Sequence, residues 1–375
     1  MQVPLLDLKL QYAPLKAQLL KEIEAVADSQ ALLLGPQTEK LEKAVAAYCG
    51  AGHAIGVSSG TDAELILLMA LGIGRGDKVL TTPYTFFATA SCVARLGATP
   101  VFVDIDPVTY NISVPALEAA IAQHPDAKAI VPVHLYGQCA DMEGIVALGK
   151  KHGIPVLEDA AQALGARHPF GGAGAIGEAG WFSFYPTKNL GAFGDAGMVV
   201  CHNDTLAAKM RALRNHGMEV RYYHKWIGGN FRIDALQSAV LNVKLPHLDA
   251  WSTGRRARAE FYRRAFAKHT LPITLPAEVY ADRGIEHHHI YNQFIIRAPR
   301  RDDLRAALTK AGIGSEIYYP LCLHMQECFA YLGYREGEFP ESERAAKETL
   351  ALPIFPELTE DQQAYVVEQI AAFYT

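Results

Sequence analysis

Short β-rich runs alternate with helical stretches along the chain as far as Cys201. This alternation constrains the fold most, because strands separated by helices pair mostly in parallel and are covered on both faces. The expected strands are Lys78–Thr82, Pro100–Asp104, Ala129–Val133, Ile154–Glu158, Trp181–Phe184 and Met198–Cys201, and the expected helices include Thr61–Leu71, Ala88–Leu96, Pro115–Ala122 and Met142–His152. The fold class is therefore α/β, and ligands should bind at the carboxyl ends of the strands.

The pattern changes after Pro246. A long basic helix, LDAWSTGRRARAEFYRRAFAKH, is followed by an expected strand in HHHIYNQFIIRA, a helix in RRDDLRAALTKAGI and a strand in SEIYYP. A chain of 375 residues is long enough for two units that each bury a core. We therefore expect a large α/β domain over residues 1–250, which includes the amino-terminal segment, and a smaller α+β domain over residues 251–375.

Charge and composition limit the classes of partner and the cellular compartment that can be expected. The formal net charge is −5, and no basic run predicts nucleic acid or an anionic membrane as a partner. The amino end has no signal-peptide pattern, and the apolar runs are too short to cross a bilayer. The six cysteines lack CxxC spacing, which is typical of free thiols in a reducing compartment. We expect a cytoplasmic protein.

Lys188 occupies an unusual place in the sequence. The run WFSFYPTKNLGAFGDAGMVV is aromatic, apolar or glycine apart from Lys188, Asp195 and a few small polar residues. An apolar pocket disfavours the ammonium form of lysine, so the pKa falls and the amine becomes a nucleophile and proton carrier. Lys188 is therefore a candidate to condense with an aldehyde cofactor.

Asp159 stands at the end of the expected strand in IPVLED. An acid at the carboxyl end of a strand is commonly a helix cap, and this interpretation stays open from the residue alone. The alternative is that Asp159 holds the protonated ring nitrogen of pyridoxal phosphate, which needs such a carboxylate to act as an electron sink. Lys188, which follows a strand as Asp159 does, favours this alternative.

A small, flexible turn precedes the apolar helix in VSSGTDAELILLMALG. Ser58, Ser59, Gly60 and Thr61 supply hydroxyl groups and backbone N–H groups at the amino end of that helix, where the helix dipole favours an anion. The alternative is a plain N-cap by Ser59 or Thr61. Together with Lys188 and Asp159, the turn is better interpreted as a phosphate site.

Three further motifs are given structural interpretations. Adjacent residues of a strand point to opposite faces, so His287, His288 and His289 do not predict a three-ligand metal site, and we expect no metal. GIGRGD at residues 72–77 lacks a preceding strand and predicts a loop rather than a dinucleotide site. The glycine-rich FGGAGAIGEAG predicts a mobile hairpin.

Taken together, the motifs resemble a known family. They are GVSSGTDA, TTPYTFFATA, VFVDIDPVTYNI, PVHLYGQCADM, PVLEDAAQALGA, SFYPTKNLGAFGDAGMV and RNHG, in this order. The chain resembles the pyridoxal-phosphate-dependent nucleotide-sugar aminotransferases of the DegT/StrS group over nearly its whole length. The resemblance implies the fold of type I pyridoxal phosphate enzymes, with pyridoxal 5′-phosphate (PLP) as the cofactor and its amine form (PMP) arising during turnover.

The resemblance also implies a role for each matching residue. Lys188 would be the Schiff-base lysine, Asp159 would pair with the pyridine nitrogen, and Gln162 would contact the ring oxygen. The phosphate would be held by Gly60, Thr61 and Ser183, Phe86 would stack on the ring, and Asn230 in GGNFRID would reach the phosphate of the partner in a homodimer with shared active sites. The alternative for Asn230 is a turn residue after two glycines, and nearby Arg232 could serve the interface.

The resemblance implies transfer of an amino group from an amino acid, L-glutamate, to a nucleotide-linked keto-sugar. Tyr318, Tyr319 and His324 in EIYYPLCLHMQ would contact the sugar substrate, although the tyrosines also fit the edge of a core. The pattern resembles members that aminate C3 rather than C4. Two other functions stay open: sugar dehydration, whose enzymes carry histidine in place of the lysine, and a non-enzymatic regulatory role, for which no DNA-binding motif is visible.

Overall fold

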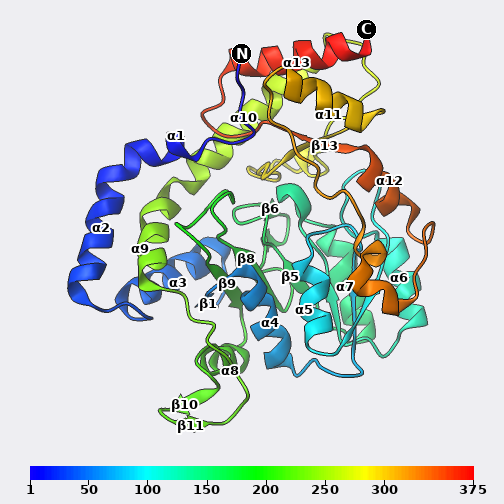
Figure 1. Ribbon diagram of the computed structural model, residues 1–375. Helices are drawn as coiled ribbons and strands as arrows, with labels where there is room; N and C mark the ends of the chain where they lie inside the picture. The colour runs from blue at the N-terminus through cyan, green and yellow to red at the C-terminus, as the bar shows by residue number, and fades with distance from the viewer.

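The computed structural model describes residues 1–375, and its centre is one twisted sheet (Figure 1). One part of the sheet has the strand order β3-β2-β4 and the other has the order β5-β8-β9-β1. Isolated bridges between Ile130 and Val156 and between Val133 and Asp159 join β4 to β5. The strands are β1 His53–Val57, β2 Lys78–Thr81, β3 Thr99–Phe102, β4 Ala129–Val131, β5 Leu157–Asp159, β8 Ala179–Ser183 and β9 Gly197–Cys201.

The pairing confirms the expected mostly parallel sheet. β2 pairs in parallel with β3 and β4, and β5 pairs in parallel with β8. Only β9 runs antiparallel to its neighbours β8 and β1. The sequence interpretation missed β1, because its five residues include a glycine and lie between two loops.

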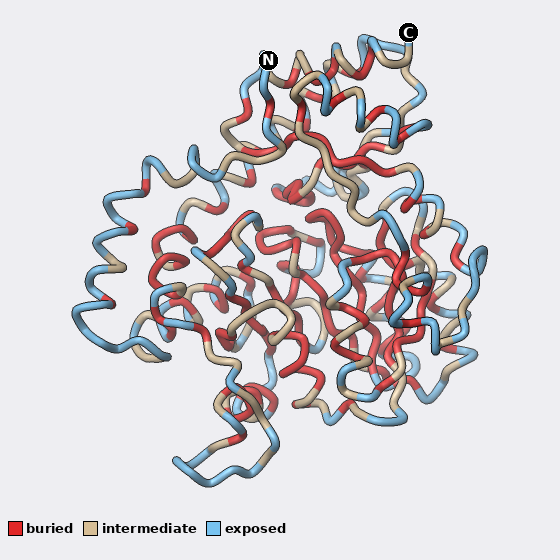
Figure 2. The backbone as a smooth tube through the Cα atoms, viewed as in Figure 1, coloured by how far each residue is buried: buried red, intermediate tan, exposed pale blue.

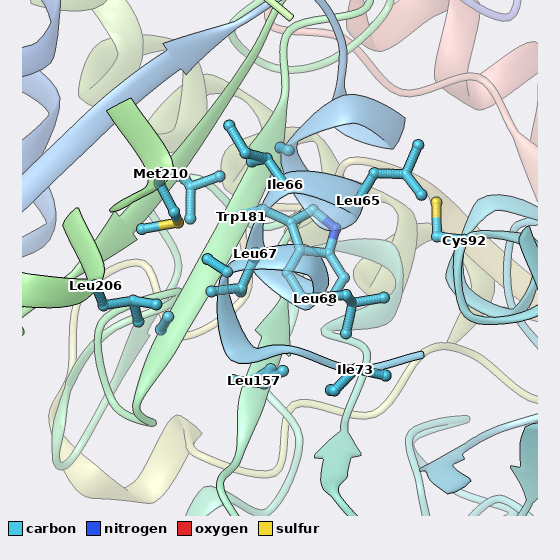
Figure 3. Packing of buried hydrophobic residues seen from close by; sticks show 14 of the residues in the cluster. Leu65, Ile66, Leu67, Leu68, Ile73, Cys92, Leu157, Trp181, Leu206 and Met210 are labelled. Carbon is cyan, nitrogen blue, oxygen red and sulfur yellow. The ribbon is translucent and has the colours of Figure 1, made fainter. Parts of the chain in front are cut away.

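Helices flank the sheet as the alternation predicted. The observed helices of this part are α3 Pro36–Cys49, α4 Gly60–Leu71, α5 Ala88–Arg95, α6 Val114–Gln123, α7 Met142–His152, α8 Asp204–Arg214 and α9 Ala235–Lys244. Apolar residues on almost every side of α4 are buried, because this helix packs against strands β8 and β9 and helices α5 and α8. Figure 3 shows Trp181 of β8 among Leu65, Leu67 and Leu68 of α4, so the strand that leads to Lys188 lies on a packed core.

The carboxyl-terminal part forms a second core beside the sheet, at the top of Figure 1. It contains α10 Leu248–Phe266, β12 Phe294–Arg297, α11 Arg301–Lys310, α12 Pro340–Glu348, β13 Thr349–Leu352 and α13 Glu360–Tyr374. β12 and β13 are antiparallel. The strand expected in HHHIYNQFIIRA is confined to its end, and SEIYYP forms no strand, since only Glu316 makes an isolated bridge, to Ala351.

The amino-terminal residues pack on this second core. The Val3 N–H donates to the carbonyl of Gly312 at 2.9 Å, and the Gly314 N–H donates to the carbonyl of Val3 at 2.8 Å. Val3 is buried among Tyr262, Phe266 and their neighbours. The predicted boundary assigns residues 1–250 to the large domain, whereas the structure ties the first residues to the smaller one; α1 Leu8–Tyr12 and α2 Lys16–Ser29 then follow.

Two short hairpins complete the chain. β6 Arg167–His168 pairs with β7 Gly171–Gly172, and β10 Met218–Val220 pairs with β11 Tyr223–His224. The β10–β11 hairpin projects away from the body beyond α8, and Figure 2 shows it exposed along its length. None of the helices combines the length and the apolar character needed to span a bilayer.

Candidate active site

Three of the predicted site residues lie at or just after the carboxyl ends of β5 and β8. Because β5 and β8 are parallel, with Asp159 opposite Trp181, both strands end at the same edge of the sheet. Asp159 is the last residue of β5, Ser183 is the last of β8, and Lys188 follows in a turn in which its N–H donates to the carbonyl of Tyr185 at 2.8 Å. The fold thus gathers residues that the sequence separates.

Asp159 is buried and held by two donors. The Thr89 hydroxyl donates to Oδ2 at 2.8 Å, and the Ala161 N–H donates to Oδ1 at 3.1 Å. Burial raises the pKa of the Asp159 carboxyl, while these hydrogen bonds and the positive charge of Lys188 oppose the rise. No helix follows Asp159, so the helix-cap alternative is wrong.

Lys188 is partly buried, and its Nζ has no hydrogen-bond or ion-pair partner within the chain. Burial lowers the pKa of Lys188 to about 8, against the opposing effect of the negative charge on Asp159. The amine is therefore neutral in a large fraction of molecules at mildly alkaline pH. This is the property that the apolar run around Lys188 predicted.

Gln162 connects the site to the smaller domain. Its Oε1 accepts the N–H of Tyr136 at 2.7 Å, and its Nε2 donates to the hydroxyl of Tyr319 at 3.2 Å. The Tyr319 ring lies 6.0 Å from the exposed ring of Phe86. Gln162, Tyr319 and Phe86 therefore lie together. The sequence predicts that Gln162 and Phe86 contact the cofactor and that Tyr319 contacts the sugar substrate.

The proposed phosphate site combines the start of α4 with the end of β8. The Ser59 hydroxyl accepts the N–H of Asp62 at 3.0 Å, so Ser59 is an N-cap, as the alternative interpretation expected. The N–H groups of Gly60 and Thr61 have no acceptor within the helix and stay available to an anion. A Cβ atom on Gly60 would lie 2.8 Å from the Cβ of Ser183, so glycine permits this close approach.

The backbone next to Asn230 is hydrogen-bonded to the segment that precedes α4, but Asn230 itself is exposed. The next residue, Phe231, accepts the Ser58 N–H at 3.0 Å, and Arg232 Nη1 donates to Asn215 Oδ1 at 2.7 Å. The contact predicted between Asn230 and a partner's phosphate stays a prediction.

The other two predicted substrate residues are placed differently. The Tyr318 carbonyl accepts the Tyr84 hydroxyl at 2.7 Å and also the Tyr136 hydroxyl, which fixes the backbone beside Tyr319. His324 is buried in an aromatic cluster with Phe102 and Phe339, and its Nε2 lies 3.2 Å from Glu343 Oε1. The contacts of His324 are with this cluster rather than with Lys188 or Asp159, and its contact with the sugar stays a prediction.

The three adjacent histidines have separate partners. His287 contacts Thr253 at 3.0 Å, His288 contacts Glu278 at 3.3 Å, and the His289 ring stacks on Tyr291 at 3.8 Å. Each is therefore accounted for by packing and hydrogen bonds within the chain.

The sequence interpretation missed the support behind Asp159. Glu158 is fully buried and accepts His134 Nε2 at 2.7 Å and the N–H groups of Gly174, Ile176 and Gly177 at 2.8, 2.6 and 2.6 Å. His134 Nδ1 accepts the Ala140 N–H, so the ring proton is on Nε2 and is donated to Glu158. The glycine-rich segment predicted to be a mobile hairpin is thus hydrogen-bonded to β5. In the sequence, the only feature that could have indicated this support is that Glu158 directly precedes Asp159 at the end of the expected strand.

The arrangement fits pyridoxal phosphate. Lys188 supplies an unpaired amine of lowered pKa, Asp159 supplies a buried carboxylate, and Gly60 allows Ser183 to approach the open start of α4. An aldehyde, a pyridine nitrogen and a phosphate require these three kinds of group.

Comparison with known proteins decides the family. The model of the DegT/DnrJ/EryC1/StrS aminotransferase family matches residues 14–371. The chain belongs to this family. It is 52% identical to the "pleiotropic regulatory protein" of Geobacillus stearothermophilus over 100% of this chain and 99% of that protein, and 44% identical to the UDP-N-acetyl-3-dehydro-α-D-glucosamine 3-aminotransferase of Acidithiobacillus ferrooxidans over 98% and 97%.

A solved relative supports the fold of this aminotransferase. The crystal structure of DesV from S. venezuelae in complex with a ketimine intermediate superposes with a TM-score of 0.94 at 40% identity, covering 100% of this chain and 98% of that one. The predicted fold of type I pyridoxal phosphate enzymes is confirmed. The aminotransferase assignment is likewise confirmed by the family.

Proposed function

We propose that the protein transfers an amino group from an amino acid, L-glutamate, to C3 of a nucleotide-linked keto-hexose, with pyridoxal 5′-phosphate as its cofactor. The observation that carries this proposal is the location of both Lys188 and Asp159 at one edge of the sheet in a chain of this family. The position of the ketone is supported by the 3-aminotransferase from Acidithiobacillus ferrooxidans, which covers nearly the whole chain.

Each site residue has a task that follows from its contacts. When bound, pyridoxal phosphate supplies an electron sink for the negative charge that develops at the α-carbon of the donor. The Asp159 carboxylate, fixed by Thr89 and Ala161, holds a proton on the ring nitrogen. Lys188 Nζ, whose pKa burial lowers to about 8, would accept the proton of the α-carbon. The start of α4 and Ser183 bind the phosphate.

A homodimer is part of the proposal. The β10–β11 hairpin projects from the body and exposes Val220, Tyr222 and Tyr223, and Ile227, which follows it, is 93% exposed. The rings of Phe86, Tyr185 and Phe193 around the Lys188 segment are also exposed. A second copy of the chain would cover both apolar surfaces and bring Asn230 to the partner's phosphate.

A cytoplasmic location belongs to the same proposal. All six cysteines are free, and five of them are buried. A chain that keeps its thiols reduced is typical of a reducing compartment.

The name of the Geobacillus relative favours a second candidate, a regulatory role. Dehydration is less well supported, because Lys188 occupies the position at which the dehydratases carry histidine. Amination at C4 uses the same machinery and differs only in the position of the ketone.

A two-part absorbance experiment tests the proposal. Glutamate alone should convert the cofactor of the purified protein to its amine form, and a nucleotide-linked 3-keto sugar should then convert it back. A panel of 3-keto and 4-keto sugars on different nucleotides assigns the acceptor. Faster return with 4-keto sugars would overturn C3, and no response to any donor or sugar would favour the regulatory role.

A further inference from the structure

A cavity of about 90 Å³ lies between the two domains, next to the Lys188 segment. Its polar wall consists of Arg255 of α10, Asn292, Gln293, Thr187 and Tyr318. Thr187 directly precedes Lys188, and Tyr318 directly precedes Tyr319, whose hydroxyl binds Gln162. Two residues that line the cavity are therefore adjacent in the chain to residues of the active site.

Arg255 differs from the other buried arginines. Arg214, Arg255 and Arg301 are the three arginines classed as buried, and Arg255, at 4% exposure, is the most buried of them. Arg214 pairs with Glu42, and Arg301 Nε pairs with Asp302 at 2.7 Å. Arg255 has no ion pair. Among these three it alone lacks an ion pair, although the negative charge of Glu357 acts on it from farther away.

The hydrogen bonds of Arg255 leave part of its guanidinium unused. Nη1 donates to the carbonyls of Tyr291 and Ile354 at 3.0 and 2.9 Å and lies 3.5 Å from the carbonyl of Asn292. Nε and Nη2 make no hydrogen bond within the chain. Guanidinium N–H groups in this fork bind carboxylates in pairs.

We propose that Arg255 and this cavity form the binding site for a carboxylate group of the amino donor. A buried cation without a direct ion pair is costly, so an anion that enters the cavity and contacts Arg255 gains an electrostatic interaction that is little screened by water. Thr187, which lines the cavity, directly precedes Lys188, the residue whose amine reacts with the donor in the proposed function. The carboxylate would hold the donor on the side of the site formed by Thr187 and Tyr318.

This inference rests on the proposed amino acid donor. A carboxylate could also come from a sugar acid, a uronate, so the experiment has an arm for each source. The probe for the site itself is glutarate, which has the two carboxylates of glutamate but no amino group and cannot react. Calorimetry of glutarate binding to the holoenzyme reads the site without turnover.

Arg255→Gln removes the guanidinium, and Arg301→Gln is its matched control. Arg301 also donates Nη1 to two backbone carbonyls, at 3.1 and 2.8 Å, but it is paired with Asp302 and does not line the cavity. Arg255→Gln should weaken glutarate binding by about tenfold or more and raise the KM for glutamate in the first half reaction. Arg301→Gln should leave both values near those of the wild type.

A second variant keeps the test decisive if Arg255→Gln does not fold. Ala351 lines the cavity, so Ala351→Val reduces its volume while Arg255 keeps its carbonyl partners. It should weaken glutarate binding as well. The half reaction with a nucleotide-linked keto-sugar that carries no carboxylate on its sugar ring should stay near normal in both cavity variants.

Unchanged glutarate binding in Ala351→Val and in folded Arg255→Gln would overturn the carboxylate site. A loss restricted to a keto-uronate substrate would overturn its assignment to the donor. If the wild-type enzyme binds glutarate through Arg255 but does not react with glutamate, the proposed donor fails while the carboxylate site stands.

Discussion

Burial affects the two central charges of the site in opposite directions. It lowers the pKa of the Lys188 ammonium to about 8 and raises the pKa of the Asp159 carboxyl. Both shifts favour the neutral forms, but Asp159 is compensated by Thr89 and Ala161, whereas Nζ of Lys188 has no partner. The acid is thereby kept ready to carry a charge and the amine is kept ready to lose one.

Replacing Lys188 removes the nucleophile and the proton carrier together. Lys188→Ala should fold, should bind the cofactor through the phosphate and Asp159 contacts, and should lose transamination by at least about a thousandfold. Single-turnover absorbance with glutamate measures the loss. Near-normal turnover in this variant would show that another group carries the proton.

Asp159→Asn removes the negative charge but keeps the shape of the side chain. Both half reactions should slow by more than about tenfold, roughly 1.4 kcal/mol in the barrier, because the ring nitrogen loses its counter-charge. Stopped-flow absorbance measures each half separately. Rates within tenfold of the wild type would mean that Asp159 serves only the turn that it forms with Ala161.

The lowered pKa of Lys188 also predicts how stability depends on pH. Between about pH 8 and the ordinary lysine pKa of 10.5, the unfolded chain binds more protons than the folded apoenzyme, so the contribution of Lys188 to stability rises with pH. Lys188→Met removes this unfavourable charge. The apo variant should be more stable than the apo wild type at neutral pH, and urea titrations should show the difference shrinking from pH 8 upward. Parallel curves would contradict the lowered pKa.

Residue type explains which site residues the sequence could predict. Lys188 and Asp159 are charges in apolar runs, and such a placement is visible in one dimension. Glu158 and Arg255 are also buried charged residues, but their roles depend on partners far away in the chain, such as His134 and Ile354. No local spacing identifies those partners.

Strand β5 is the element that connects the site to its support. Alternate side chains of a strand point to opposite faces, so Asp159 faces Thr89 while Glu158 binds the segment around Gly174 and His134 on the other side. The backbone N–H of His134 also donates to the backbone carbonyl of Asp159 at 2.9 Å. Movement of the Glu158 contacts would therefore move Asp159.

Glu158→Gln places an NH₂ group against donors that now meet carboxylate oxygens. The variant should lose about 1–3 kcal/mol of stability, and its affinity for pyridoxal phosphate should fall as Asp159 shifts. Glu343→Gln is the matched control, because Glu343 also binds a buried histidine, His324, and the N–H of a glycine, Gly337. Urea denaturation and cofactor titration should show reduced stability in both but reduced affinity only in Glu158→Gln. Equal affinities would contradict a positioning role.

Helices and central strands were predicted better than the segments that join the domains. α7 has the predicted bounds, and α4 and α5 differ from theirs by one residue at one end, because caps and apolar periodicity define helix ends locally. The segment around Tyr318 was predicted as a strand from its aromatic residues. In the structure its backbone is bound by the Tyr84 and Tyr136 hydroxyls instead, a tertiary contact that periodicity does not reveal.

At the scale of the whole molecule, exposed apolar residues lie next to the site. Phe86 and Tyr185 flank the Lys188 segment and are exposed, and the β10–β11 hairpin extends an apolar surface away from the body. An isolated chain would present both surfaces to water. The proposed homodimer was predicted from the family resemblance alone, since no residue pattern distinguishes a projecting hairpin from one folded back on its own chain.

Subunit mixing tests whether two chains share each site. If Asn230 completes the partner's phosphate site, a heterodimer of Asn230→Ala and Lys188→Ala subunits has one site with both defects and one intact site. Randomly exchanged equimolar mixtures should then recover about one quarter of wild-type activity, although each variant alone is impaired. If Asn230 serves its own subunit, every site of the heterodimer carries one defect and no activity returns. Exchange is verified beforehand with subunits of different mass, so that absent recovery contradicts the shared site rather than the mixing.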